Sequence, residues 1–325
     1  MKATTLKKAA VFAGSLSFLA GSAFSQQAFS GVGGYRTVNI DNGFNLVGVN
    51  LHNPVLVSGA IDTETDADVG DSTVDYTTIL TDADATYVFE VLDGAQAGAI
   101  AEITAAANGS VTVDGAIGAG VGSAYSIRQA PSLNDTFGDL APGFTAVTAD
   151  VVYVPTGVGG GYDTYFQHQL SGQFRPTTAP GADPAKPVSW LYSDGVLVER
   201  KTEGPLALVI TGMVKTTGTI VNVPSGFGAV AVSAPVGSEL NDENGLKATI
   251  NPGFTAVTAD VVYVPAGAPG AYDTYFVHQL SGNFRSTTSP GADADPLPIN
   301  NAVLVERKGD DTAGLLGVPA FYENL

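Results

Sequence analysis

A long internal duplication constrains the fold of this chain more than any other feature of its sequence. Residues 142–183 recur as residues 252–293, and 34 of the 42 positions are identical in the two segments. Each segment is followed by the sequence Val-Leu-Val-Glu-Arg-Lys, at 196–201 and again at 303–308. Because segments this similar form the same structure, the chain is predicted to contain two homologous structural units.

The repeated unit extends upstream of these segments. Residues 38–49 and 221–232 share a Val-Asn pair, a Gly-Phe pair and alternating valines near their ends. The stretch between this element and the long repeat is much longer in the first copy, so we infer an insertion there. The predicted domains are a signal peptide at 1–25, a first repeat unit at 26–56 and 132–216, an inserted β module at 57–131, and a second repeat unit at 217–325.

The local composition favours strands over helices. Residues 149–155 form a β-branched and aromatic run that ends at a proline, and residues 163–170 alternate polar and apolar side chains. The 40 Gly and 18 Pro residues supply turns between short strands, which are typical of sandwiches and barrels. We therefore predict an all-β fold with two tandem homologous β-sandwich or jelly-roll-like units, the first interrupted by a smaller inserted β module.

Composition excludes several classes of function. The chain has no cysteine, so it holds neither disulfides nor cysteine-based zinc sites. Its 32 acidic residues outnumber its 14 Lys and Arg residues, which gives a formal net charge of −18. A protein that binds nucleic acid or an anionic lipid surface needs a basic face, so we expect neither partner.

The N-terminal segment is typical of a signal for export. Three lysines among the first eight residues precede an uncharged stretch at 9–24, and cleavage is expected after Ser25. No later run of apolar residues is long enough for a spanning helix, so we expect no membrane span after cleavage. An exported chain without cysteine is typical of a bacterial periplasm, cell surface or extracellular space.

Short motifs follow one another along the chain. They are Gly-Phe-x-Leu-Val at 43–47, Tyr-Val-Phe-Glu-Val-Leu-Asp-Gly at 87–94, Ser-Ala-Tyr-Ser-Ile-Arg at 123–128, Leu-Asn-Asp-Thr-Phe-Gly at 133–138 and Ala-Asp-Val-Val-Tyr at 149–153. In this order they resemble an uncharacterised family of exported, β-rich proteins from verrucomicrobial-type bacteria. The resemblance implies placement at the surface or in the periplasm, and it implies no activity. The chain departs from that pattern in carrying a near-perfect second copy of its latter half.

Aromatic and acidic side chains recur at equivalent positions of the two repeats and are candidates for binding a ligand. Aromatic rings beside polar groups are typical of sites that stack on and hydrogen-bond to sugar rings. Packing in a core is the alternative explanation for the same aromatic residues. The candidates are Tyr162, Asp163, Tyr165, His168 and Trp190 in the first unit, and Tyr272, Asp273, Tyr275 and His278 in the second.

A dense acidic stretch in the predicted inserted module is a candidate calcium site. Its carboxylates alternate along the sequence beside a glycine, as in calcium-binding loops, although the bidentate glutamate of the EF-hand is missing. A solvated acidic loop is the alternative, and no other cofactor is expected. The candidate ligands are Asp62, Glu64, Asp66, Asp68 and Asp71.

No constellation of reactive groups in the sequence predicts a reaction, so no catalytic residue is assigned and we expect no enzyme. Low charge density, tandem copies and apolar strands favour a secreted structural or interaction protein, which assembles with itself or with other surface components. A polysaccharide- or other ligand-binding module with two duplicated sites is the alternative. A hydrolase that uses the duplicated Asp163 and Asp273 with the histidines is the third hypothesis.

Overall fold

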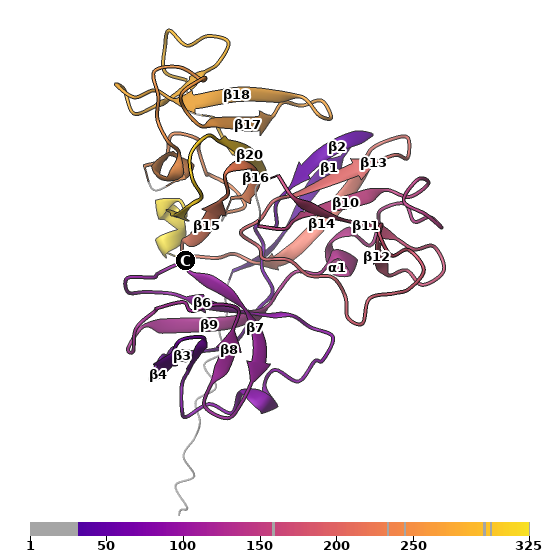
Figure 1. The fold of residues 1–325 in the computed structure, drawn as a ribbon, viewed down its shortest axis with the longest axis vertical. Helices are drawn as coiled ribbons and strands as arrows, with labels where there is room; N and C mark the ends of the chain where they lie inside the picture. The colour runs from indigo at the N-terminus through magenta and orange to yellow at the C-terminus, as the bar shows by residue number, and fades with distance from the viewer. Residues whose placement is uncertain are drawn as a thin grey trace, which may run out of the picture. The chain divides into compact units, whose positions relative to one another are not determined.

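The computed structural model describes residues 32–157, 160–232, 234–243, 245–294, 297–299 and 301–324. The predicted signal peptide at residues 1–25 lies outside these described residues. In the described part antiparallel sheets dominate and the helical segments are short, which confirms the predicted all-β class (Figure 1). No helix in these ranges is sufficiently long and apolar to cross a bilayer. The helical segments are α1 (Leu133–Phe137), η1 (Tyr76–Thr78), η2 (Leu246–Thr249) and η3 (Ala320–Asn324).

The first five-stranded sheet has the strand order β12-β11-β10-β13-β2. Its strands are β2 (Gly43–Val47), β10 (Val151–Pro155), β11 (Tyr162–Gln167), β12 (Phe174–Pro176) and β13 (Val196–Arg200). Alternate residues of these strands turn toward one core, where Val152, Val196 and Val198 are fully buried. β-Branched side chains suit these positions because they pack well on a pleated surface. The paired strands β1 (Gly33–Ile40) and β14 (Leu206–Met213) contribute to the same core.

A second five-stranded sheet has the strand order β16-β20-β17-β18-β19. Its strands are β16 (Gly226–Ala231), β17 (Val261–Pro265), β18 (Tyr272–Val277), β19 (Phe284–Ser286) and β20 (Ala302–Arg307); β15 (Thr219–Val223) and β21 (Thr312–Leu316) pair beside it. The order across the sheet is that of the first sheet, with β16 in the place of β2. Val262 pairs with Tyr275 in this sheet, as Val152 pairs with Tyr165 in the first.

Between β2 and α1 the chain forms a seven-stranded sheet in the order β3-β9-β6-β7-β8-β5-β4. Its strands are β3 (Val55–Ala60), β4 (Thr63–Thr65), β5 (Asp68–Gly70), β6 (Tyr87–Val91), β7 (Ile100–Ala106), β8 (Val111–Val113) and β9 (Ala124–Gln129). This sheet has a core of its own, in which the rings of Phe89 and Tyr125 stack with centroids 5.0 Å apart. Each of the three larger sheets therefore has a separate core.

Two reciprocal hydrogen bonds join the two five-stranded sheets. In the turn after β10, Gly160 donates its N–H to the carbonyl of Phe227 at 2.8 Å, and in the turn after β17, Gly270 donates to the carbonyl of Phe44 at 2.9 Å. The backbones approach closely here, since a Cβ atom on Gly195 would lie 2.9 Å from a methyl group of β20. We call this region the junction. Its apolar residues are Leu46, Leu197, Ala229, Ala302 and Leu304.

Candidate functional site

The predicted ligand-binding residues do not gather in one cleft. Trp190 is buried in the first core, where its ring stacks on Phe137 with centroids 5.7 Å apart. Tyr165 packs against the same core, and Tyr275 is buried in the second core. These aromatic rings are therefore part of the packing: Trp190 and Tyr275 are buried, and Tyr165 is half-buried.

Tyr162 and Tyr272 are the predicted residues that the structure brings toward each other. Each begins the strand that follows a junction turn. Burial and then the proximity of Tyr272 raise the pKa of Tyr162. Asp163 and Asp273 follow in the sequence, but both are exposed and point to the other face of their strands. The carboxylates are thus separated from the tyrosines that were expected to act with them.

A row of three aromatic rings on each sheet leads to the junction. Neighbouring ring centroids lie 5.8 to 6.4 Å apart in both rows. At the middle of the first row, Tyr153 donates its hydroxyl to Glu199 at 2.9 Å, and burial together with this carboxylate raises the pKa of Tyr153 to about 12. The rows are Phe44, Tyr153 and Tyr162 on the first sheet, and Phe227, Tyr263 and Tyr272 on the second.

The acidic stretch at residues 62–71 forms the hairpin of β4 and β5. Four of its five predicted ligands accept hydrogen bonds from separate partners, namely Asp62, Glu64, Asp68 and Asp71, whereas Asp66 is exposed in the turn. Asp62 accepts hydrogen bonds from the N–H and hydroxyl of Ser72, and Glu64 accepts from the N–H of Gly120 at 2.7 Å. Within the described ranges no group of three or more His, Asp or Glu side chains is arranged to hold a metal ion. The hydrogen bonds explain how this many acids are accommodated in one hairpin.

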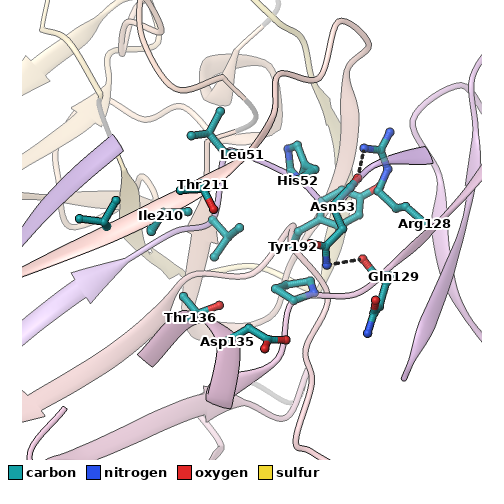
Figure 2. A pocket seen from close by; sticks show the side chains of 13 residues that line it. Leu51, His52, Asn53, Arg128, Gln129, Asp135, Thr136, Tyr192, Ile210 and Thr211 are labelled. Atoms are coloured by element: carbon teal, nitrogen blue, oxygen red, sulfur yellow. Dashed lines mark hydrogen bonds between the residues drawn. The ribbon is translucent and has the colours of Figure 1, made fainter. Parts of the chain in front are cut away.

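A cavity of about 120 Å³ lies beside β9, and Figure 2 shows the side chains that line it. The side-chain amide of Asn53 donates to the backbone carbonyl of Gln129 at 3.1 Å, and the backbone carbonyl of Asn53 accepts from the Arg128 guanidinium at 3.1 Å. The ring of His52 meets Tyr192 edge-on with centroids 4.6 Å apart. The polar groups of this cavity are thus used to fix the seven-stranded sheet to the segment that follows β2.

A buried ionic network continues from Arg128. Glu90 of β6 is fully buried, with Lys215 Nζ at 2.6 Å and Arg128 at 3.2 Å from its carboxylate oxygens. Burial alone would raise the pKa of Glu90, but these two cations lower it below its ordinary value. The network joins the seven-stranded sheet to the segment between β14 and β15. Because both cations bind the same buried carboxylate, the network serves as a structural link.

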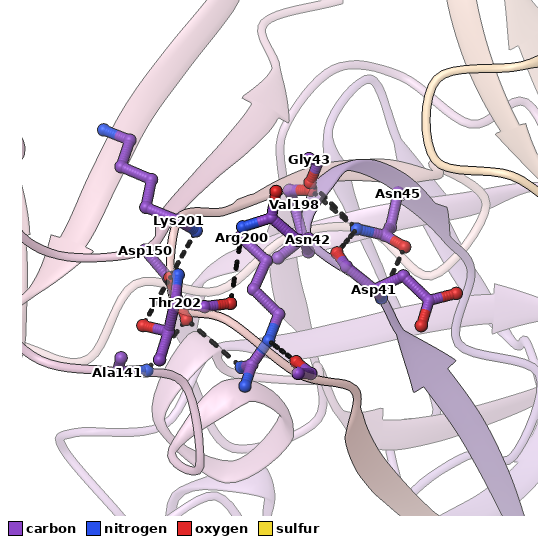
Figure 3. A network of polar contacts seen from close by, with 11 residues as sticks. Asp41, Asn42, Gly43, Asn45, Ala141, Asp150, Val198, Arg200, Lys201 and Thr202 are labelled. Carbon is purple, nitrogen blue, oxygen red and sulfur yellow. Dashed lines mark hydrogen bonds and ion pairs between the residues drawn. The ribbon is translucent and has the colours of Figure 1, made fainter.

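A second buried network is built around Asp150, which precedes β10. Its carboxylate accepts from the N–H of Ala141 at 2.9 Å and of Lys201 at 2.8 Å, and Arg200 lies 3.5 Å away (Figure 3). The carboxylate therefore ties the start of one loop to the end of β13. In the second sheet Asp260 holds the equivalent position and accepts from the same kinds of donor.

The predicted histidines lie beside these loops. His168 meets Phe144 edge-on with ring centroids 6.1 Å apart, and His278 meets Phe254 in the same way at 6.2 Å. The distance from His168 Nδ1 to Ser171 Oγ is 3.4 Å. In a nucleophilic triad an imidazole stands between the serine and the carboxylate. Here Ser171 instead donates its hydroxyl directly to the carboxylate of Asp183.

The carboxylate of Asp183 binds an arginine in addition to Ser171. Ser171 donates to Asp183 at 2.7 Å and Arg175 donates to the same oxygen at 2.6 Å. These hydrogen bonds, from Arg175 first and Ser171 second, lower the pKa of Asp183. The carboxylate is thus used in closing a turn, and the arrangement lacks the orientation that a serine nucleophile needs.

The loop anchored by Asp150 carries apolar side chains into solvent. Gly143 accepts from the N–H of Gln169 at 3.0 Å, which places this loop beside the turn between β11 and β12. Phe144 and Val147 of the loop and Leu170 of the turn are between 58% and 82% exposed. We call these three residues the first tip.

The second sheet carries the same feature at the same place. Phe254, Val257 and Leu280 are between 57% and 79% exposed, and we call them the second tip. Lys308 donates to the carbonyl of Ala256 at 2.8 Å and so helps to hold the loop in place. Sequence reasoning missed both tips because a Phe, a Val and a Leu in a β protein are ordinarily core residues.

Both tips point away from the junction. β10 begins at Val151 beside the first tip and ends at Pro155, from which the chain turns to the junction at Gly160. β17 runs in the same sense, from the second tip at Val261 to the junction turn at Gly270. Each sheet therefore has one end engaged with the other sheet and one end that presents exposed apolar side chains.

Comparisons with known proteins give no match to this chain among family models, curated proteins or solved structures. The choice of a candidate site therefore rests on the exposure and chemistry of the described residues. The tips are the clearest candidate, since they combine exposure, apolar character and presence in both sheets.

Proposed function

We propose that this protein is a secreted, non-enzymatic structural or interaction protein of the bacterial surface or periplasm, which associates with further copies of itself through its two tips. The observation that carries the proposal is the exposure of the same apolar side chains at both tips. Soluble monomers seldom expose large contiguous apolar patches, and the largest exposed patch is often a binding site. The N-terminal sequence typical of export supports the proposed location.

In this proposal the two five-stranded sheets belong to copies of one β-sandwich-like unit. The duplicated sequence, the common strand order and the equivalent pairing of Val152 with Tyr165 and of Val262 with Tyr275 support this. Duplication then explains why a single chain has two tips. A molecule with two equivalent contact sites can join two neighbours, which a molecule with one site cannot.

Charge favours a second copy as the partner. The chain has a formal net charge of −18, so two copies repel each other over most of their surfaces. The loop at 143–148 and the turn at 169–172 contain no acidic residue, and the same holds for 253–258 and 279–282. The tips are therefore places where two chains can touch without bringing carboxylates together.

The expected association is weak and depends on concentration. Burying the six apolar side chains of two facing tips is worth roughly 9 kcal/mol, at about 1.5 kcal/mol each. Lost translational and rotational freedom costs about 4 to 15 kcal/mol. The two terms are of similar size, so stable assembly needs a high local concentration or several contacts at once.

Light scattering of the purified chain over a wide concentration range tests this proposal. We expect the mean mass of the wild-type protein to rise with concentration. A variant with Val147→Ser, Leu170→Ser, Val257→Ser and Leu280→Ser should stay monomeric, because polar tips remove the driving force. The control is Val121→Ser, since Val121 is 69% exposed but lies in the seven-stranded sheet's domain, away from the tips.

Two outcomes would contradict the proposal. One is a wild-type protein that stays monomeric at every concentration. The other is a four-site variant that associates as strongly as the wild type, which would place the contact elsewhere. Equal melting temperatures of the wild type and the variant are expected, since exposed positions contribute little to folding stability.

A further inference from the structure

A surface hollow at the junction is lined by residues of both five-stranded sheets. Its volume is about 130 Å³. Asp41 and Phe44 line it from the first sheet, and Pro269 and Tyr272 line it from the second. Phe44 is 43% exposed, so part of its ring is open to a ligand.

The turn that begins with Asp41 is held by hydrogen bonds to one side chain. Asn45 donates its side-chain amide to the carbonyls of Asp41 at 2.7 Å and of Gly43 at 2.9 Å, and its side-chain oxygen accepts the N–H of Asp41 at 3.0 Å. Gly43 has a φ of +100°, which favours glycine. This geometry fixes the positions of Asp41 and Phe44 before any ligand binds.

Two polar groups beside the hollow have no partner within the described part of the chain. The carboxylate of Asp41 makes no hydrogen bond or ion pair there, and Figure 3 shows it without a dashed line beside the fully bonded Asn45. The hydroxyl of Tyr272 also has no hydrogen bond in these residues, and burial raises its pKa. Partly buried groups of this kind gain from a ligand that offers hydrogen-bonding partners.

We propose that this hollow binds one uncharged pyranose ring of a polysaccharide. The apolar face of such a ring can lie on Phe44, while its hydroxyls donate to Asp41 and bond to Tyr272. Pockets for drug-sized ligands measure about 300 to 1,000 Å³, so a hollow of this size takes one ring of a longer chain. The negative charge of Asp41 and of the whole chain disfavours anionic glycans.

The other side of the junction provides a natural control. By the sequence correspondence of 38–49 with 221–232, Phe227 corresponds to Phe44 and is 42% exposed. Pro224 stands in the place of Asp41, and Gly228 stands in the place of Asn45. The second side therefore has the aromatic ring without counterparts of Asp41 and Asn45, and the carboxylate that lies at its turn, Asp311, already accepts the N–H of Ser225 at 2.7 Å. We expect one binding site per chain, not two duplicated ones.

Affinity electrophoresis of the full chain tests the proposal, with gels that contain dextran, mannan, galactan or, as the anionic comparison, polygalacturonate. At least one neutral polysaccharide should slow the wild-type protein. Phe44→Ala and Asp41→Asn should each weaken that binding about tenfold, through loss of the ring face or of the charge-assisted hydrogen bonds. Phe227→Ala should bind as the wild type does.

Three results would overturn the proposal: no retardation by any neutral polysaccharide, stronger retardation by polygalacturonate, or an equal loss in Phe227→Ala and Phe44→Ala. Thermal unfolding of each variant shows whether a loss of binding is a loss of fold, and Asp41→Asn keeps the shape of the side chain. The site is independent of the tips, so the variant with four serines at the tips should retain full binding.

Discussion

The carboxyl of Asp194 at the junction predicts that the free energy of unfolding depends on pH. It pairs with Val230 of β16 in an isolated β-bridge, and the next residue, Gly195, donates its N–H to the carbonyl of Ala229 at 3.0 Å. Burial raises the pKa of the Asp194 carboxyl from 3.8 to about 6, against a smaller lowering by a 3.4 Å hydrogen bond from Ser193. The carboxyl is therefore held at the junction most easily in its neutral form.

The size of the effect follows from this shift. A native pKa above the unfolded value means that the stabilisation is complete below about pH 4 and is lost as the pH rises through about 6. Two pKa units correspond to about 3 kcal/mol, and residual contact with solvent lowers this to about 2 kcal/mol. Asp194→Asn removes the charge and should therefore raise the free energy of unfolding by about 2 kcal/mol at pH 8.

Urea unfolding of the wild type and of Asp194→Asn at pH 4 and pH 8 measures this. At pH 4 the two proteins should differ by less than about 0.5 kcal/mol, because the wild-type carboxyl is then largely protonated in the native state. Asn301 stands before β20 as Asp194 stands before β13, and its side-chain amide donates to the carbonyl of Leu46 at 3.1 Å. Asn301→Asp should lose more stability at pH 8 than at pH 4. A difference between Asp194→Asn and wild type that is the same at both pH values would refute the reasoning.

Three further predictions concern other carboxylates. Asp150→Ala leaves Arg200 buried without its partner and should lower the free energy of unfolding by about 3 to 5 kcal/mol in urea titrations; a loss below about 1 kcal/mol would contradict the structural role. Glu90→Gln leaves two buried cations without a counter-charge and should cost about as much, with a smaller loss at alkaline pH, because burial lowers the pKa of Lys215 and its deprotonation removes one of the two charges. Asp293, bonded to Arg285 and Ser281, should titrate by NMR with a pKa of about 2, so its contribution to stability is present at neutral pH and is lost as the pH falls through that value.

The all-β class could be predicted because strand signals are local. The run at 149–155 contains β10, and the alternation at 163–170 overlaps β11, which ends at Gln167, since β-branched residues and turn residues act over a few positions. The partners of these strands could not be derived in the same way. The pairing of β13 with β2 joins residues about 150 positions apart, and nothing in either segment specifies the other.

The candidate sites could not be predicted for the same reason, because they depend on which distant segments lie next to one another. Trp190 looked available for a ligand, but Phe137 of α1 covers its ring. The sequence does not indicate Phe44 as a binding residue, because its neighbours Tyr153 and Tyr272 come from other strands and from the other sheet. The tips could have been suspected from the identity of their residues in both copies, but only the fold shows that these apolar side chains face solvent.

Sedimentation velocity of variants with only one intact tip tests the central claim most directly, because it measures the size of the assemblies that they form. One variant carries Val147→Ser and Leu170→Ser, and the other carries Val257→Ser and Leu280→Ser. If the tips bind one another, the wild type forms species larger than dimers at high concentration, and each single-tip variant stops at the dimer. Single-tip variants that form the same large species as the wild type would contradict the account.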